Sequence, residues 1–466
     1  MPATDFDLLV TGHETEGVLA AVAALRAGAR VALAAPAGAL LGGLLTEDGL
    51  AFVDRDSRHL IPPQDSPHDG LFGQFLARAG VPLVALEARR GHATLEEMLA
   101  GVTRLEGDAT AVRLEAGRIV AVTVGGQEVT SRHVIDATPD LDLAELAGMR
   151  FATGFQEYGD ARSLGISPLP LVYGVTPAMI METCRALSAD SALEALKQRV
   201  FGDRAFLELG AGDDYVLVGP PHLGLAYHRW RDAQGFPAGP YPFEADGFNV
   251  AVLGPAVTSW NGLIYFARDP QAALRLSREG ADVFFREEAA RFGRFLREGL
   301  GWRDARVELP RGVYVRQTRH ALDVHHRLTL AELAAGYAEG SVGTFSYYAD
   351  FRGFHSPHVP GPVTGHVILG AGLASAVRNL GLASRAGGYT PFAHSFCRLV
   401  QYNATLGTAL GVAAAQAGED LGVVPAAAIR EELSRQGALA ADPAGFERNP
   451  VVAAALRADP IISREG

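Results

Sequence analysis

Two glycines and a glutamate near the N-terminus have the spacing of a dinucleotide-binding turn. Within Asp7–Leu45, Gly12 and Gly17 occupy the outer positions of a G-x-G-x-x-G pattern, and Glu14 occupies the middle position. Such a turn presents the N–H groups of a helix N-terminus to a pyrophosphate, and its middle glycine allows the backbone to approach the phosphates closely. The turn is therefore a candidate phosphate site, and Glu14 is the residue that conflicts with it.

A second conflict lies at the end of the next predicted strand. Val31–Ala35 ends on Ala35, at the position where an acidic residue normally binds ribose hydroxyls. A carboxylate about 4 Å from a phosphate is repelled by roughly 4 kcal/mol at an effective dielectric near 20. Each lost ribose hydrogen bond costs about 1 kcal/mol. Either the Glu14 side chain points elsewhere, or it folds back onto neighbouring N–H groups and closes the pocket itself.

The hydrophobic pattern around these residues predicts the frame that would position them. Asp7–Thr11 and Val31–Ala35 predict strands, and Val18–Ala27, almost wholly alanine, valine and leucine, predicts the helix between them. A helix of small apolar residues can pack closely on a sheet and be buried on more than one side. The segment therefore predicts the βαβ unit of a parallel, Rossmann-like sheet in an α/β protein.

Composition divides the chain into four parts. The middle of the chain is richer in proline and aromatic residues than either flank, and the glycine fingerprint is not repeated there. The predicted parts are the start of a nucleotide-binding domain (1–139, with a β-meander near 103–131), an inserted α+β substrate domain (140–365), a return segment of the first domain (366–420) and a helical tail (421–466). Within the substrate domain, Pro270–Gly299 predicts one long amphipathic helix.

Charge and composition exclude several functions. The chain has 466 residues and a formal net charge of −12, so nucleic acid and anionic membrane surfaces are not expected partners. Lys197 is the only lysine, which argues against a P-loop and against Schiff-base chemistry. Two distant cysteines, the N-terminal sequence and the lack of a long apolar run predict a cytoplasmic protein with no disulfide framework.

Histidines provide few candidates for chemistry. His355 and His358 imitate a metal-binding pair, but no third ligand follows at suitable spacing, so no metal site is predicted. His325 and His326 are adjacent and point to different faces, so at most one of them could face a site.

Four separated motifs follow one another along the chain: the βαβ unit, Pro36–Leu50 (PAGALLGGLLTEDGL), His133–Gly148 (HVIDATPDLDLAELAG), and the C-terminal pair Asn379–Arg385 (NLGLASR) and Arg398–Gly411 (RLVQYNATLGTALG). Taken in order, they resemble the FAD-dependent oxidoreductase family with a glutathione-reductase-type Rossmann domain. The resemblance covers most of the chain, and the order and spacing of the motifs make it more specific than any one of them. YVRQTRHALDVHHRLT resembles the family's V-R-E-T-R-R block.

The resemblance implies FAD as cofactor and assigns residues to its parts. The implied pyrophosphate and ribityl contacts are Gly12, Gly17, Gly42, Gly43 and Thr46, with Glu14 and Ala35 at the two altered positions. Asp136, Ala137 and Thr138 would lie beside the adenosine half, and Ser384, Arg385, Gly407 and Thr408 would line the flavin. Ser384 stands where the family has glycine, and Thr408 where it has glutamine, so this site departs from the family pattern in several places.

Three further residues are candidates for contact with a substrate. Arg316 and Arg319 match the family's arginine pair, and such a pair suits a carboxylate by bidentate hydrogen bonding. The alternative is that both arginines form internal salt bridges. His394, in the loop before the C-terminal helix, is the candidate for proton transfer.

Two functions remain open at this point. The first is an FAD-dependent oxidoreductase that acts on a small organic substrate by hydride transfer to or from the flavin. The second is a non-catalytic relative that has kept the fold, lost the cofactor, and serves as a binding or partner protein. Glu14, Ala35 and Ser384 motivate the second function, while the substrate, the electron acceptor and the oligomeric state are not indicated.

Overall fold

A five-stranded parallel sheet forms the base of the molecule. The computed structural model describes residues 5–56, 68–202, 204, 206–267, 269–352, 354, 361–443 and 449–465. The sheet order is β22-β7-β1-β2-β3, and every neighbouring pair is parallel. Its strands are β1 (Phe6–Thr11), β2 (Val31–Ala35), β3 (Thr103–Glu106), β7 (Ser131–Asp136) and β22 (Leu380–Leu382). The α/β class and the Rossmann-like parallel sheet predicted from the sequence are therefore confirmed.

Two helices pack against each other beside this sheet. Helix α1 (Thr15–Arg26) connects β1 to β2, and α12 (Val400–Gln416) lies along it. Helix α1 begins at Thr15, earlier than the predicted Val18, because Glu14 is extended and is the N-cap residue. The segment far along the sequence thus returns to cover the first βαβ unit.

The β-meander lies between β3 and β7. It consists of β4 (Ala109–Glu115), β5 (Arg118–Val124) and β6 (Gln127–Val129), paired antiparallel in that order. Strand β3 is not part of the meander, because it pairs in parallel with β2. The chain therefore adds an edge strand to the main sheet before it enters the meander.

A second hydrophobic core, with members from Ile166 to Val315, forms a separate lobe. We call this part the second lobe and the part built on the parallel sheet the first lobe. The six-stranded sheet of the second lobe has the order β11-β12-β14-β15-β10-β17. Its elements are β10 (Leu171–Tyr173), α5 (Pro177–Ser188), α6 (Ser191–Phe201), β11 (Leu209–Ala211), β12 (Tyr215–Val218), α7 (His222–Ala233), β14 (Phe248–Gly254), β15 (Val257–Asn261), α8 (Pro270–Glu279), α9 (Val283–Arg294), a π-helical turn (Phe295–Gly299) and β17 (Arg306–Glu308).

The single long helix predicted over Pro270–Gly299 is wrong, because the segment is broken between α8 and α9. Gly280 has φ +82°, which ends α8. Asp282 then caps α9 by accepting a hydrogen bond from the Phe285 N–H at 3.0 Å. Glycine is typical of the end of a helix and aspartate of the start of the next, so the Gly-Ala-Asp sequence indicates two helices, although the apolar spacing continues through it.

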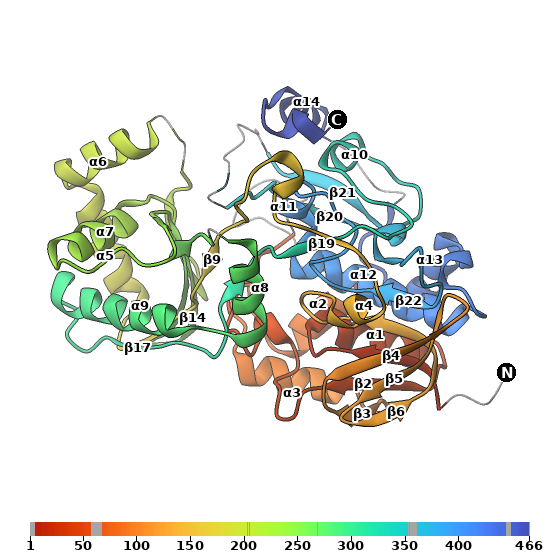
Figure 1. The fold of residues 1–466 in the computed structure, drawn as a ribbon. Helices are drawn as coiled ribbons and strands as arrows, with labels where there is room; N and C mark the ends of the chain where they lie inside the picture. The colour runs from red at the N-terminus through yellow and green to blue at the C-terminus, as the bar shows by residue number, and fades with distance from the viewer. Residues whose placement is uncertain are drawn as a thin grey trace.

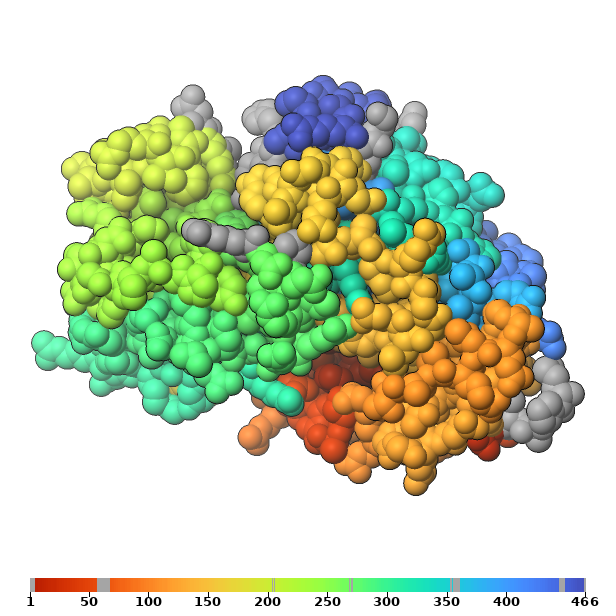
Figure 2. Space-filling view, in the orientation of Figure 1, coloured from red at the N-terminus to blue at the C-terminus, as the bar shows by residue number. Residues whose placement is uncertain are grey.

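The first lobe also contains the antiparallel pair β20 (Ser341–Tyr347) and β21 (Val363–Ile368), which packs with α12. In Figure 1 the second lobe is on the left, the parallel sheet is at the lower right, and β20, β21 and α12 lie above that sheet. Figure 2 shows the green second lobe beside the gold segment and the red part of the first lobe.

The remaining helices and strands complete the two lobes. They are α2 (Gly70–Arg78), α3 (Ala88–Met98), α4 (Asp142–Leu146), β8 (Phe151–Thr153), β9 (Ile166–Ser167), β13 (Phe243–Glu244), β16 (Ile264–Tyr265), β18 (Tyr314–Val315), β19 (Arg319–Ala321), α10 (Leu330–Ala335), β20 (Ser341–Tyr347), β21 (Val363–Ile368), α11 (His394–Cys397), α13 (Ala426–Arg435) and α14 (Pro450–Ala458). Within the described residues, no helix has the length and apolar character needed to cross a membrane.

Candidate functional site

The two glycine loops predicted to hold a pyrophosphate lie against each other. Gly42 donates its N–H to the His13 carbonyl at 2.7 Å, and Glu14 and Gly42 form a parallel bridge. Gly12 has φ +106°, and a Cβ on it would lie 2.4 Å from the Ala137 carbonyl oxygen. A Cβ on Gly17 would lie 2.5 Å from the Ala137 Cβ. These glycines therefore bring the first turn close to the end of β7, as the fingerprint requires.

The Glu14 carboxylate fills the space between the two loops. Its Oε2 accepts a hydrogen bond from the Leu44 N–H at 3.0 Å, and only 7% of the residue is exposed. Gly43 has φ +47°, and a Cβ there would lie 2.1 Å from Glu14 Oε1. Of the two orientations considered for Glu14, the structure has the one that folds back onto a neighbouring N–H group.

Two more carboxyl groups surround Glu14. Burial raises the pKa of Glu14, raises that of Glu16 well above its usual value, and raises that of Asp48 to about 7. Repulsion from Glu14 raises the pKa values of Glu16 and Asp48 further. Glu16 Oε2 is buried without a hydrogen-bond partner. The positive charge of His13 opposes the shifts of Glu14 and Asp48, and that of Arg385 opposes all three.

Arg385 is itself held by the chain. Its Nη2 donates to Asp140 Oδ1 at 3.2 Å and to Ser277 Oγ at 2.5 Å. The neighbouring Ser384 hydroxyl donates to the Pro139 carbonyl at 2.7 Å. These contacts join the end of β22 to the loop after β7 and to α8. The Ser384 hydroxyl donates its hydrogen bond to the protein's own backbone.

Several residues assigned to the cofactor contact the protein's own backbone. Thr46 Oγ1 donates to the Leu41 carbonyl at 3.0 Å, and Thr408 Oγ1 donates to the Ala404 carbonyl at 2.6 Å. The Ala35 methyl group offers no hydrogen bond, and its carbonyl accepts from the Gly107 N–H at 2.8 Å.

The residues at the end of β7 also form hydrogen bonds with the protein's own chain. The Asp136 carboxylate accepts hydrogen bonds from the N–H and hydroxyl of Thr138 and from the Ala144 N–H. It therefore holds the loop that leads into α4. Thr138 Oγ1 in turn accepts a hydrogen bond from the Asp142 N–H at 2.8 Å.

The structure separates the predicted arginine pair. Arg319 donates to the carbonyls of Asp140 and Leu141 and forms an ion pair with Glu145 at 2.8 Å. Arg316 donates instead to the Gly165 carbonyl, and its guanidinium lies over the Tyr314 ring. The two side chains share no hydrogen-bond partner among the described residues, so they do not form one fork.

His394 is completely buried in the first lobe. Its Nε2 lies 2.7 Å from the Arg316 carbonyl oxygen, and its ring lies edge-on to that of His320. Burial lowers the pKa of His394 to about 3, so its imidazole is neutral at physiological pH. His325 and His326 lie at the surface of the first lobe, partly or fully exposed, and His355 and His358 lie outside the described residues.

A cluster that the sequence did not indicate surrounds Tyr314. Arg398 donates to the Tyr314 hydroxyl at 2.5 Å and to Asp350 Oδ2 at 2.7 Å. Arg352 faces Asp246 at 3.6 Å. These residues come from separate parts of the chain and form no local motif, so no spacing rule could have found them. In the described part of the chain, no group of three His, Cys, Asp or Glu side chains is arranged for metal binding.

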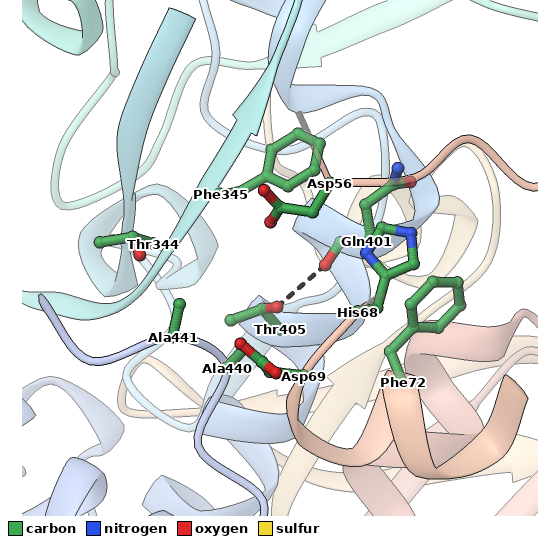
Figure 3. Close-up of a pocket in the computed structure, with 10 residues that line it drawn as sticks. All are labelled: Asp56, His68, Asp69, Phe72, Thr344, Phe345, Gln401, Thr405, Ala440 and Ala441. Carbon is green, nitrogen blue, oxygen red and sulfur yellow. Dashed lines mark hydrogen bonds between the residues drawn. The ribbon is translucent and has the colours of Figure 1, made fainter. Parts of the chain in front are cut away.

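A small polar pocket lies where α2, β20 and α12 meet (Figure 3). Ten residues line it: Asp56, His68, Asp69, Phe72, Thr344, Phe345, Gln401, Thr405, Ala440 and Ala441. Thr405 Oγ1 donates to the Gln401 carbonyl at 2.9 Å, and Gln401 Nε2 donates to the Asp54 carbonyl at 3.2 Å. None of the lining residues was a predicted site residue.

Comparison with known proteins decides the family. A family model described as FAD dependent oxidoreductase matches residues 7–433. The chain belongs to the FAD-dependent oxidoreductase family. Members of this family are flavin-dependent enzymes, and the resemblance predicted from the four motifs is confirmed.

The chain also matches several solved structures at low sequence identity. The flavin-dependent brominase Bmp2 is 11% identical, with a TM-score of 0.43, over 92% of this chain and 83% of Bmp2. GidA of Aquifex aeolicus is 11% identical, with a TM-score of 0.39, over 91% of this chain and 65% of GidA. A geranylgeranyl bacteriochlorophyll reductase-like protein of Thermoplasma acidophilum is 13% identical, with a TM-score of 0.37, over 93% of this chain and 81% of that protein.

The residues of this family member do not fit the pyrophosphate of FAD. The cradle between the glycine loops is filled by the Glu14 carboxylate, which accepts the Leu44 N–H that a phosphate oxygen would need. Glu16 Oε2, which is buried without a hydrogen-bond partner, belongs to the first turn of α1, directly after Glu14 and Thr15. At the second altered position Ala35 has no group for a ribose hydroxyl. The βαβ frame of the family is retained, while the atoms that would contact the cofactor have changed.

Proposed function

We propose that this chain is a family member that does not hold FAD in the family's dinucleotide site and acts as a binding or partner protein for a small organic molecule. The observation that carries the proposal is the hydrogen bond from the Leu44 N–H to Glu14 Oε2, at 3.0 Å. The Glu14 carboxylate thus accepts the hydrogen bond that a phosphate oxygen of the cofactor would otherwise accept. No redox step is therefore assigned to the protein.

The size of the effect supports this choice. A carboxylate and a phosphate about 4 Å apart repel by roughly 4 kcal/mol at an effective dielectric near 20. That repulsion corresponds to a loss of affinity on the order of a thousandfold. If Glu14 takes up a proton the repulsion disappears, but its side chain still occupies the space between Gly43 and the first turn. Both charge and volume therefore oppose a pyrophosphate.

The visible spectrum of freshly purified protein tests the proposal. We expect a colourless protein without a flavin band, and no rise in melting temperature when FAD is added. The double variant Glu14→Gly, Ala35→Glu reopens the cradle and restores the ribose acid. We expect it to bind FAD more tightly by a factor on the order of a thousand.

Single variants and a control make the test specific. Glu14→Gly alone should account for most of the gain, and Ala35→Glu alone for little, because the cradle stays closed. Asp108→Asn, at an exposed site outside the cradle, should not change FAD binding. A yellow wild-type protein that releases FAD on denaturation would refute the proposal, as would unchanged weak FAD binding by the double variant.

The retained frame favours a second candidate, an FAD-dependent oxidoreductase acting on a small organic substrate by hydride transfer. Gly12 and Gly17 still bring the first turn against Ala137, and α12 still covers α1. In this case Glu14 would have to leave the Leu44 N–H when the cofactor binds. The same spectrum separates the two candidates, because this one requires yellow protein.

A further inference from the structure

Three side chains of the second lobe form a chain of hydrogen bonds that ends on a serine hydroxyl. Ser188 Oγ lies 3.2 Å from His222 Nδ1, and His222 Nε2 lies 2.8 Å from Glu194 Oε2. A serine within hydrogen-bond reach of an imidazole, which is in turn oriented by a carboxylate, is the arrangement that activates a nucleophile. No residue of this chain belongs to the glycine loops.

Three helices bring these side chains together. Ser188 is the last residue of α5, Glu194 lies in the first turn of α6, and His222 is the first residue of α7. The three helices contact one another and lie together at the left of Figure 1. Because each side chain stands at the end of a packed helix, its position relative to the other two is fixed by that packing.

The carboxylate of Glu194 determines which nitrogen of His222 can act as a base. An ionised carboxylate only accepts hydrogen bonds, so the proton of the neutral imidazole is on Nε2 and the lone pair is on Nδ1. Nδ1 therefore accepts from the Ser188 hydroxyl. The hydrogen bond from Lys197, and after it those from His222 and Gln198, lower the pKa of Glu194 to about 2, so this carboxylate is ionised at neutral pH.

The serine is open to solvent, whereas the histidine is not. Ser188 is exposed, and His222 is 4% exposed. The two residues share a narrow slot with the apolar side chains of Cys184, Leu209, Val218 and Leu223. The slot has almost no free volume, so it cannot bury a long acyl chain. A substrate therefore reaches Ser188 from the solvent side, which favours a small acyl group.

The start of α7 supplies donors for a developing negative charge. The N–H groups of Leu223 and Gly224 have no acceptor among the described residues, as is usual in the first turn of a helix. Leu223 lines the same slot as Ser188, and the positive end of the helix dipole lies there. Backbone N–H groups of this kind stabilise the oxyanion of acyl transfer.

We propose that Ser188, His222 and Glu194 hydrolyse small, activated carboxylic esters. Ser188 Oγ attacks the acyl carbon while its proton passes to His222 Nδ1, and that proton then goes to the departing alkoxide or phenolate. Water next attacks the acyl-serine and gives a proton to His222 Nδ1, the proton returns to Ser188 Oγ, and the carboxylic acid leaves. The reaction consumes one water and involves no redox change, so it goes beyond the proposed function.

Hydrolysis of p-nitrophenyl acetate by the purified protein tests the proposal. We expect release of p-nitrophenolate faster than in buffer alone. Ser188→Ala should lower kcat/KM about a hundredfold or more, which is the size of a general-base contribution. His222→Gln should lower it as much, and the double variant no further, because the two residues act as a unit. A fluorophosphonate probe should label Ser188, as read by mass spectrometry of the peptides.

Glu194 acts through His222 and is a positioning residue, so the pH profile tests its role. Glu194→Gln removes the negative charge that favours a protonated imidazole. The rate should fall, and the acid limb of the profile of kcat/KM against pH should move to lower pH. A lower rate with an unmoved acid limb would contradict this role.

Ser191→Ala and His228→Gln are the controls. Ser191 is exposed at the start of α6, and the His228 side chain is 43% exposed on α7. Neither residue belongs to the chain of hydrogen bonds, so both variants should keep the wild-type rate and the label on Ser188. Circular dichroism checks that the variants fold. If His222→Gln does not fold, Ser188→Ala decides, because it changes an exposed side chain.

Three results would overturn the proposal. They are a wild-type rate equal to that of buffer, a rate unchanged in Ser188→Ala, and a fluorophosphonate label on a residue other than Ser188. None of these measurements depends on whether the protein is yellow, so their failure is distinct from failure of the proposed function.

Discussion

Three carboxyl groups share one buried space with a single guanidinium. Glu14, Glu16 and Asp48 all have raised pKa values, with burial as the largest cause; His13 opposes the shifts of Glu14 and Asp48, and Arg385 opposes all three. An acid with a raised pKa in the folded state stabilises the protein below its unfolded pKa, and this stabilisation is lost as the pH rises through the folded pKa. The acids that close the dinucleotide cradle therefore reduce stability at neutral pH.

Asp48→Asn should flatten the dependence of stability on pH. The pKa of Asp48 is raised from 3.8 to about 7, so the wild type should lose stability between pH 4 and 7 as this group ionises. Allowing for partial exposure, the loss from this one group is on the order of 2 kcal/mol. Urea unfolding at several pH values measures it. Asp108→Asn, at an exposed site, should keep the wild-type profile, and a parallel profile for Asp48→Asn would contradict the assignment.

At the scale of the secondary-structure elements, helices α1 and α12 of the first lobe pack closely against each other. Gly407 and Gly411 on α12 face α1, and a Cβ at either position would lie within 2.4 Å of a backbone carbonyl oxygen, that of Glu16 or that of Ala20. The sequence resemblance assigned Gly407 to the flavin. In the structure this glycine brings α12 close to the start of α1, where Glu14 and Glu16 lie. The same small residues therefore support the frame whether or not a cofactor is bound.

Gly411→Ala should destabilise the protein through this contact. The new Cβ would lie 2.1 Å from the Ala20 carbonyl oxygen, and overpacking of a tight core costs typically 1–3 kcal/mol, so we expect about 2 kcal/mol. The free energy of unfolding in urea measures the effect. Gly418→Ala is the matched control, because its Cβ would meet no atom within 4 Å. Equal stability of the two variants would show that α12 can move away from α1 without cost.

At the scale of the whole molecule, the sequence predicted those helices and strands whose apolar residues repeat at regular spacing. The βαβ unit followed from apolar spacing and glycines, and the return of the C-terminal segment to the first domain followed from the resemblance of its two motifs to the family. The break at Gly280 and Asp282 was missed because the apolar period continues through it. The arrangement of Arg316, Arg398 and Asp350 could not be predicted, because tertiary packing brings together three segments with no shared motif. The sequence allows two orientations of Glu14, because the choice between them depends on the N–H group of Leu44, which lies in another loop.

The seam between the lobes contains one aspartate with three backbone partners. Asp214 belongs to the second lobe, and its Oδ2 accepts hydrogen bonds from the N–H groups of Leu83, Val84 and Ala85 in the first lobe, at 2.8–2.9 Å. The residue is 5% exposed, and Phe52 packs edge-on against the neighbouring Tyr215. Such a contact orders a loop of one lobe on the surface of the other.

Asp214→Ala should loosen the seam. It leaves three donors without their acceptor, and a buried donor that loses its partner costs about 1–3 kcal/mol, so we expect a loss of about 3 kcal/mol after water re-enters part of the gap. Urea unfolding should show this loss, and limited proteolysis should cut the chain near residues 83–85 faster than in the wild type. Asp213→Ala changes the adjacent but exposed carboxylate and should leave both measurements unchanged. If Asp214→Ala and Asp213→Ala behave alike, the lobes are held together by apolar contacts at the seam and not by this carboxylate.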